Sequence, residues 1–319
     1  MDSIRVYQHG IYPRSEAVVA ATRGFERGRT TAEEVAAALA QDRRDLIQVQ
    51  REAGMDLFSD GLLGWQDIFR PLVEATNGLD ARTLIRWFNN NSFFRAPEPN
   101  GPLSLGDGLP AVYDDDADIP APRVATLPSP LLFSRAAQTD SDRGALMFEL
   151  AREVLAPLAE QLAARGYEVI HLQEPWLTFF GIEASDWDDF DKAVGEIKQS
   201  CGSAALVLHT YFGDAGPWVD RLRRLPVDAV GIDFVETDVG ALGSNWETGL
   251  LAGCLDGRSS PVESAEGTAA FVQRLVETVQ PASLYLSSTC DLEFLPRDVA
   301  RQKVLRLGQV GAKVKEALT

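Results

Sequence analysis

LVLHTYF (206–212) is the first of four segments in the second half of the chain that share one design. The other three are VGIDFVETD (230–238), LLAGCLDGR (250–258) and LYLSSTCDLEF (284–294). Each opens with an apolar run typical of a buried strand and carries polar residues where that run stops. A parallel (β/α)8 barrel has its active site at the C-terminal ends of its strands. The pattern therefore predicts that these polar residues meet at one mouth.

Strand-like and helical segments alternate along the chain. One helical pattern, residues 30–54, begins with a threonine capping signal and stops at Gly54. Strand-like runs lie near residues 4–9, 55–58, 123–127, 169–173, 205–211, 229–233, 251–255 and 283–287. Eight such units predict an α/β fold, a single (β/α)8 TIM barrel, with a doubly wound open sheet as the main alternative. No GxGxxG motif follows the first strand, which disfavours a dinucleotide-binding fold.

One stretch interrupts this alternation. RWFNNNSFFRAPEPNGP (86–102) mixes aromatic residues with three asparagines and then breaks into proline and glycine. Residues 100–122 are rich in Gly, Pro and Asp, which predicts a surface loop, and the acidic run at 114–118 is interpreted as solvated. We expect a lid or hairpin excursion over the barrel mouth around residues 86–122.

Length and composition fit one globular barrel domain spanning residues 1–319. The hydrophobic fraction of 45% supports a sizeable core, and the net charge of −17 argues against partners such as nucleic acid or an anionic membrane surface. Three cysteines form no disulfide framework. Neither a signal peptide nor a membrane span is recognisable in the sequence, so a cytoplasmic protein is expected.

A metal site is the first chemical hypothesis. His209 and Cys290 stand at two strand ends, and Asp233, or Glu236 instead, would complete three zinc ligands with an open fourth position. Such an ion would hold a substrate thiol as thiolate, its nucleophilic form. The alternative is structural, with His209 hydrogen-bonded inside the barrel and Cys290 as a small buried hydrophobe.

Other residues near strand ends are candidates for contact with a substrate. Glu174 precedes a proline at a strand end, where its carboxylate would bind an amine or shuttle a proton, unless it pairs with an arginine. Arg258 suits a substrate carboxylate, or pairs with Asp256 or Glu263. The remaining substrate-binding candidates at the mouth are Tyr12, Arg14, Asp60, Trp65 and Asn89. The aromatic members of this set are also compatible with plain lid packing.

Several phrases together resemble one known family. These phrases are QVQREAGMDLFSDG, RWFNNNSFF, TYFGD, LPVDAVGIDFV, GCLDGRSS and STCDLEFLP. They are similar to cobalamin-independent methionine synthase, and most closely to the N-terminal, non-catalytic barrel of its two similar barrels. The resemblance covers nearly the whole chain. It implies a (β/α)8 barrel and zinc-dependent methyl transfer to the sulfur of homocysteine.

The family's functional positions carry over only in part. Its zinc-binding His, first Cys, Glu and last Cys fall at His209, Tyr211, near Asp233, and at Cys290. Its homocysteine-binding Ser, the Glu of its His-Gly-Glu segment and its Asp-Glu-Pro fall at Ile11, Leu62 and Gln173-Glu174-Pro175. A tyrosine at a thiolate position implies a zinc site weaker than that of the family.

The resulting expectation is methyl or other alkyl transfer to a small-molecule thiol such as homocysteine. The cofactors implied by the resemblance are zinc and a methyl donor, either methylfolate or a methyl-corrinoid, the latter delivered by a partner protein. Glu174 and Tyr211 are the expected catalytic residues. Two rivals remain: a metal-free, non-catalytic barrel that binds a folate-like or other small anion, and an enzyme of the same fold acting on a different substrate.

Overall fold

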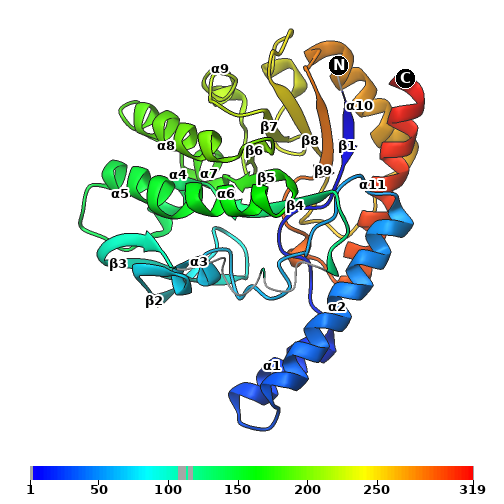
Figure 1. Ribbon diagram of the computed structural model, residues 1–319. Coiled ribbons are helices and arrows are strands. Elements are labelled where there is room, and N and C mark those ends of the chain that lie inside the picture. The colour runs from blue at the N-terminus through cyan, green and yellow to red at the C-terminus, as the bar shows by residue number, and fades with distance from the viewer. Residues whose placement is uncertain (1–2, 107–112, 114–117, 319) are drawn as a thin grey trace.

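A parallel sheet of seven strands forms the centre of the fold. The computed structural model describes residues 3–106, 113 and 118–318. The strands are β1 (Ile4–Val6), β4 (Arg123–Pro128), β5 (Tyr167–Gln173), β6 (Ala205–Thr210), β7 (Ala229–Asp233), β8 (Gly249–Leu255) and β9 (Leu284–Ser288). Their order is β1-β9-β8-β7-β6-β5-β4, and every neighbouring pair is parallel. The sheet curls about an axis, and helices cover its outer face (Figure 1).

The predicted strand at residues 55–58 is the one that does not form a ladder. It makes a single bridge, from Phe58 to Arg123. Its backbone nevertheless bonds to both edges of the sheet: Asp56 N donates to Val6 O at 2.8 Å, and Phe58 N donates to Pro122 O at 2.9 Å. Turn structure begins at Gly61, which leaves this segment too short for regular pairing.

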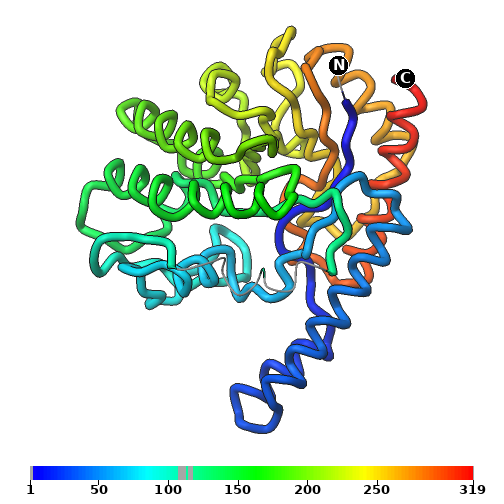
Figure 2. Tube along the Cα trace, in the orientation of Figure 1, coloured from blue at the N-terminus to red at the C-terminus, as the bar shows by residue number. Residues whose placement is uncertain are grey.

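Long helices and short helical turns form the outer layer. They are α1 (Glu16–Glu26), α2 (Ala32–Ala53), α4 (Pro130–Ala136), α5 (Arg143–Leu150), the π-helical η3 (Ala151–Leu155), α6 (Ala156–Ala164), α7 (Pro175–Phe180), α8 (Asp186–Ser200), η4 (Gly216–Trp218), α9 (Val219–Leu222), η5 (Val239–Ala241), α10 (Ala265–Val279), η6 (Leu292–Phe294) and α11 (Arg297–Leu318). The capping box of Thr31 with Glu34 and the left-handed Gly54 bound α2 as predicted. The α1–α2 hairpin projects from the body (Figure 2).

A second, two-stranded sheet lies on the side of the strand C-termini. It consists of β2 (Thr76–Arg86) and β3 (Phe93–Leu105), which pair antiparallel. This hairpin begins ten residues before the predicted excursion, and the helix expected over 64–76 is reduced to α3 (Arg70–Glu74). The Asp67 carboxylate accepts from the amides of Phe69 and Arg70 and so fixes a turn there. Most of the acidic run at 114–118 lies outside the described residues.

Eight buried side chains form one cluster inside the curled sheet. They are Tyr7, Leu57, Val124, Val169, Val207, Ala229, Leu251 and Tyr285. Each of the seven strands, or its immediate continuation, supplies one member, and the 55–58 segment supplies the eighth. A ring of inward-pointing side chains of this kind fills the interior of α/β barrels. Among the described residues, no helix has the length and apolar character needed to cross a membrane.

Candidate functional site

The next interior layer toward the strand C-termini is polar. Successive side chains of a strand alternate between its faces, so residues two positions beyond the apolar ring point the same way. These residues are His9, Ser59, Thr126, His171, His209, Gly231, Gly253 and Ser287. Branched apolar side chains dominate most barrel interiors. Three imidazoles, three hydroxyls and two glycines in one layer therefore indicate a site rather than ordinary packing.

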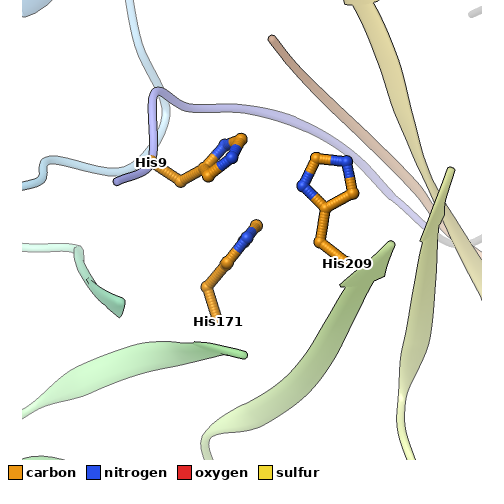
Figure 3. Close-up of side chains that lie close together, drawn as sticks. All are labelled: His9, His171 and His209. Carbon is orange, nitrogen blue, oxygen red and sulfur yellow. The ribbon is translucent and has the colours of Figure 1, made fainter. Parts of the chain in front are cut away.

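The three imidazoles of this layer lie against one another (Figure 3). The rings of His9 and His171 stack with centroids 4.2 Å apart, and His209 meets them edge-on at 4.8 Å and 5.3 Å. All three side chains are fully buried. One nitrogen from each ring belongs to a set whose members all lie within 4.8 Å of one another. We call His9, His171 and His209 the histidine cluster.

Hydrogen bonds at Nδ1 fix the rings of His9 and His171. Nδ1 of His9 lies 2.8 Å from Ser287 Oγ, and Nδ1 of His171 lies 3.0 Å from Tyr7 Oη. Nε2 of both rings and both nitrogens of His209 have no hydrogen-bond partner among the described residues. Burial lowers the pKa of His9 to about 3, and it also lowers the pKa values of His171 and His209. The cluster is therefore neutral at physiological pH, with unused lone pairs.

Two glycines make room for His209. A Cβ added at Gly231 would lie 2.6 Å from His209 Cδ2, and one added at Gly253 would lie 3.3 Å from Nε2. The Cδ2–Nε2 edge of the ring therefore lies along β7 and β8. The opposite edge, which carries Nδ1, faces the other two rings (Figure 3).

Two carboxyl groups, the buried Asp291 and the half-buried Glu293, follow strand β9 at the mouth. Oδ1 of Asp291 accepts from Ile11 N at 2.6 Å and from Gln173 Nε2 at 2.8 Å. Burial raises the pKa of Asp291, and hydrogen bonds from Gln173 and Ile11 partly oppose this. Burial and the neighbouring charge of Asp291 raise the pKa of Glu293, against the attraction of Arg14. The two acids therefore compete for negative charge in one enclosed space.

A small cavity of about 20 Å³ opens at these acids, beneath the β2–β3 hairpin. It is lined by Ile11, Gln66, Asp67, Ile68, Trp87, Ser92, Phe93, Phe94, Gln173, Asp291 and Glu293. A much larger cavity of about 810 Å³ lies elsewhere, where α1, α2 and α11 meet, and includes Tyr12 and Arg14. Neither of these two cavities touches Glu174, His209, Asp233 or Cys290, so neither is the principal cavity expected against those residues at the strand ends.

The structure does not gather the predicted zinc ligands. Among the described residues, only the histidine cluster forms a group of three potential ligands within 4.8 Å, so Asp233 and Cys290 do not join His209. Oδ1 of Asp233 accepts from Val235 N at 2.9 Å, and burial raises its pKa to about 7. Sγ of Cys290 points to Asp291 O at 3.5 Å, and burial raises its pKa. The alternative ligand Glu236 pairs with Arg258 at 2.5 Å.

Glu174 is held by the ends of two helices. One carboxylate oxygen accepts from Leu177 N at the start of α7, and the other accepts from the Ser129 hydroxyl and Leu132 N at the start of α4. Burial raises its pKa to about 7. Tyr211, the other predicted catalytic residue, is fully buried beside His209, with ring centroids 5.5 Å apart.

The predicted substrate-binding residues are scattered. Tyr12 is buried under the guanidinium of Arg297, 5.6 Å from its ring centroid. Arg14 donates to the carbonyls of Leu63 and Trp65, so it braces the chain before the hairpin. The positive charge of Arg14 also lowers the pKa of the mouth acid Glu293, against the effect of burial.

The other four predicted contacts also lie in different surroundings. Trp65 is fully buried against Tyr113, and Asp60 accepts from Leu62 N at 3.0 Å. Asn89 is exposed at the turn of the hairpin. Arg258 lies 5.0 Å over the ring of Phe212 and pairs with Glu236.

Sequence reasoning missed four residues of the candidate site: His9, His171, Asp291 and Glu293. A signal was present. The chain holds three histidines, and each stands in or directly after a strand-like run. The two acids directly follow Cys290 in a segment that was already singled out.

Comparison with known proteins identifies relatives. The family model described as "Cobalamin-independent synthase, N-terminal domain" matches residues 74–280. A methionine synthase of Sulfolobus acidocaldarius is 22% identical over 97% of this chain and 91% of that protein. A 5-methyltetrahydropteroyltriglutamate–homocysteine methyltransferase of Herpetosiphon aurantiacus is 26% identical over 73% of this chain. The match spans 32% of that longer protein.

Solved structures share the fold. A B12-independent methionine synthase from Shewanella sp. W3-18-1, in complex with selenomethionine, superposes with a TM-score of 0.76 at 19% identity. That match covers 99% of this chain and 98% of the other. A methyltransferase from Methanosarcina mazei superposes with a TM-score of 0.58 at 12% identity, over 100% of this chain and 95% of the other.

Proposed function

The chain belongs to the family of the cobalamin-independent synthase N-terminal domain, and from this premise we propose that it transfers a methyl group to the sulfur of a small amino-acid thiol such as homocysteine. The relatives named above are a methionine synthase and a homocysteine methyltransferase. The observation that carries the proposal is the pair of acids Asp291, which is buried, and Glu293, which is half-buried: both line the small cavity, and Asp291 bonds to Gln173, two positions beyond His171 of the histidine cluster.

The mouth acids suit the ammonium group of an amino acid. Asp291 is already oriented by Gln173 and the Ile11 amide. A buried carboxylate that accepts neutral donors gains a charge-assisted hydrogen bond when an ammonium group arrives. The raised pKa of Glu293 lets the pair hold one proton between them until that cation binds. An anionic ligand, as the metal-free alternative requires, would meet like charge at this place.

The aromatic side of the mouth suits a flat methyl donor. Trp87, Phe93 and Phe94 of the hairpin line the same small cavity as the acids. Aromatic faces of this kind favour stacking with a ring system. We therefore assign the donor to methylfolate, the class printed in the name of the Herpetosiphon relative. A corrinoid and its carrier protein have no comparable support.

The hairpin must move for either ligand to enter. A space of about 20 Å³ is close to the volume one water requires and far below that of an amino acid. Closure over bound ligands would then exclude water from the reacting sulfur, which must be a thiolate to attack the methyl carbon. The bond between that carbon and the donor nitrogen breaks as the carbon–sulfur bond forms, and the demethylated folate leaves. In this proposal Gln173 and Asp291 orient the amino acid, and the hairpin aromatics orient the donor.

Zinc, when bound, would lower the pKa of the substrate thiol. The set His209, Asp233 and Cys290 does not fit this task, because its ligand atoms do not converge. We therefore assign no step to a metal held by that set. Glu174 and Tyr211 are retained as residues that shape the wall of the site.

We also propose that the sheet is a closed barrel and that residues 1–319 form one domain. The 55–58 segment would be the eighth strand of the barrel, because it bonds to both sheet edges and contributes Leu57 to the inner ring. Hydrogen exchange at the amides of Asp56 and Phe58 tests this closure. Exchange as slow as that of the neighbouring strands supports it, and exchange as fast as that of exposed loops contradicts it.

The test of function is methionine formation from L-homocysteine and methyltetrahydrofolate, with and without added Zn²⁺, followed by mass spectrometry. We expect the wild-type chain to form methionine. Asp291→Asn should raise KM for homocysteine roughly tenfold or more, because one charge-assisted hydrogen bond is lost. Asp191→Asn, at an exposed site on α8, is the matched control and should leave KM unchanged.

Two outcomes would contradict this assignment. Product formation with methylcobalamin and none with methylfolate would replace the donor. No product with either donor, from protein with an intact fold, would favour the metal-free binding barrel. An unchanged KM in Asp291→Asn would remove the mouth acids from the site.

A further inference from the structure

We propose that His9, His171 and His209 together bind one divalent transition-metal ion of the zinc type inside the barrel. The site differs from the ligand set expected from the sequence, with which it shares His209 alone. The inference is independent of the proposed function, because it rests on the donor atoms of the cluster and not on any substrate.

The histidine content of the chain is the first argument. The chain has three histidines, and all three meet in this one buried layer. Isolated buried histidines usually satisfy both ring nitrogens with nearby polar groups. Here four ring nitrogens lack a partner among the described residues, although each of the three side chains is completely buried. Leaving buried polar atoms unpaired costs free energy, so we infer that these ring nitrogens bind an ion.

Hydrogen-bond donors and acceptors fix the tautomer of His9. The Ser287 hydroxyl donates its single proton to Tyr7 O at 2.8 Å, so it can only accept from His9 Nδ1–H, also at 2.8 Å. Neutral His9 then carries its lone pair on Nε2, which has no hydrogen-bond partner among the described residues. Tyr7 Oη can hold His171 Nδ1–H in the same way. Such outer partners orient the imidazole ligands of metal sites.

The ring nitrogens are grouped closely enough for a three-histidine zinc site to form once the rings turn. A Zn–N distance of about 2.0–2.1 Å with tetrahedral angles requires nitrogens about 3.3 Å apart. The ligand nitrogens here lie within 4.8 Å of one another. Rotation of the stacked rings of His9 and His171 about their side-chain bonds would bring the nitrogens to this distance. Gly231 and Gly253 give His209 the space in which it lies.

The ligand atoms, three nitrogens of neutral imidazoles, define the class of ion. Three neutral imidazoles suit Zn²⁺, Co²⁺, Ni²⁺ or Cu²⁺ and disfavour Mg²⁺ and Ca²⁺, which prefer oxygen ligands. Three protein ligands leave a fourth position open, as in catalytic zinc sites. Gln173 stands two positions beyond His171, and both Gln173 and Asp291 lie close to Gly10, the residue after His9. We therefore place the open position on the side of the mouth.

The experiment uses the full chain without a histidine tag. Protein is stripped with a chelator, dialysed against Zn²⁺ or Co²⁺, and freed of unbound metal, and its metal content is measured by mass spectrometry. We expect about one ion per chain and a Co²⁺ absorption spectrum typical of tetrahedral nitrogen coordination. His9→Gln and His171→Gln should each abolish stoichiometric binding. Ser287→Ala should weaken it about 10–100-fold, because the outer partner of His9 is removed.

Matched variants separate this site from the one expected from the sequence. Cys290→Ser and Asp233→Asn should keep full metal content and the Co²⁺ spectrum. Loss of metal in either of them, with retention in His9→Gln and His171→Gln, would overturn the proposal. So would a wild-type chain that binds no ion and holds only ordered water in the cluster.

A second measurement needs only the wild-type protein, so it remains valid if a histidine variant fails to fold. Wild-type protein has three imidazole side chains, so its long-range ¹H–¹⁵N spectrum contains the cluster and nothing else. Zn²⁺ should shift the signals of all three rings together and saturate at one equivalent. Three unmoved rings would contradict the site, whatever activity the protein has.

Discussion

Gly231 is the residue on which the position of His209 depends most. Alanine at this place would bring a Cβ to 2.6 Å from the imidazole Cδ2. The ring or strand β7 must then shift, at a cost of about 1–3 kcal/mol in the free energy of unfolding. We expect Gly231→Ala to lower Zn²⁺ affinity at least roughly tenfold, since metal geometry tolerates little displacement.

Gly195→Ala on α8 is the control for this substitution. Its added Cβ would meet nothing closer than 3.8 Å, and alanine favours a helix by up to about 1 kcal/mol. Titration of both variants with Zn²⁺ under the same conditions gives the comparison. Equal affinity in Gly231→Ala and wild type would show that His209 does not need its present position.

Glu174 illustrates a residue whose chemistry was predicted for catalysis and whose contacts serve the scaffold. Its carboxylate caps α7 and α4 from a fully buried position. Glu174→Gln should lower the free energy of unfolding by about 1–3 kcal/mol. The glutamine side chain has one oxygen that can accept, and its NH2 group cannot replace the second carboxylate oxygen as an acceptor. Urea denaturation measures this. The exposed Glu160→Gln is the control, and equal stability of the two variants would return Glu174 to the list of substrate contacts.

At the level of single residues, the sequence identified His209 and not its partners. The polar end of each late strand was recognisable because it interrupts an apolar run. Which side chains meet across a barrel depends on register around the ring, and a local pattern does not contain that register. Asp233 and Cys290 accordingly lie at strand ends as expected but face other neighbours.

At the level of elements, we expect the hairpin β2–β3 to control access to the mouth. At its turn the ring of Phe88 packs against α7, with centroids 5.2 Å from Phe179 and 5.6 Å from Phe180. Phe88→Ala removes this contact, so residues 87–93 should exchange amide hydrogens roughly tenfold faster or more. Hydrogen-exchange mass spectrometry measures the change.

The control for the hairpin is Leu84→Ala, at a side chain of β2 that is 59% exposed. It should leave exchange at the turn unchanged. If Phe88→Ala also left exchange unchanged, the packing on α7 would not be what keeps the mouth closed.

Seven of the eight expected strands and the long helices were predictable because each has a strong periodic pattern and clear caps. The start of the hairpin was not. TNGLDARTLIR (76–86) carries polar and charged residues on an exposed, irregular pair of strands, where no core face imposes alternation. The 55–58 strand was correctly placed beside the sheet edges, but its brevity could not be judged from composition.

At the level of the whole molecule, buried acids should make stability depend on pH. Burial raises the pKa values of Glu174 and Asp233 to about 7, and that of Glu293 is also raised. The folded chain therefore binds protons that the unfolded chain has released, and unfolding becomes easier as pH rises through these values. The free energy of unfolding of chelator-treated protein should fall between about pH 6.5 and pH 8.

The histidine cluster acts in the opposite direction at lower pH. Its lowered pKa values mean that the unfolded chain takes up the protons, so this loss of stability occurs as pH falls below about 6.5. Urea unfolding at several pH values separates the two effects. A rise in stability from pH 6.5 to pH 8 would contradict the burial of the acids.

The most direct test of the central claim, that the mouth of this sheet binds an amino-acid thiol, is the position of L-selenomethionine in a crystal of the chain. Selenium gives an anomalous signal that marks the atom corresponding to the reacting sulfur. The account predicts a selenium peak inside the sheet, between the histidine cluster and the hairpin, with the ammonium group on Asp291. A peak in the large cavity beside Tyr12, or no ordered selenium at the mouth, would contradict it.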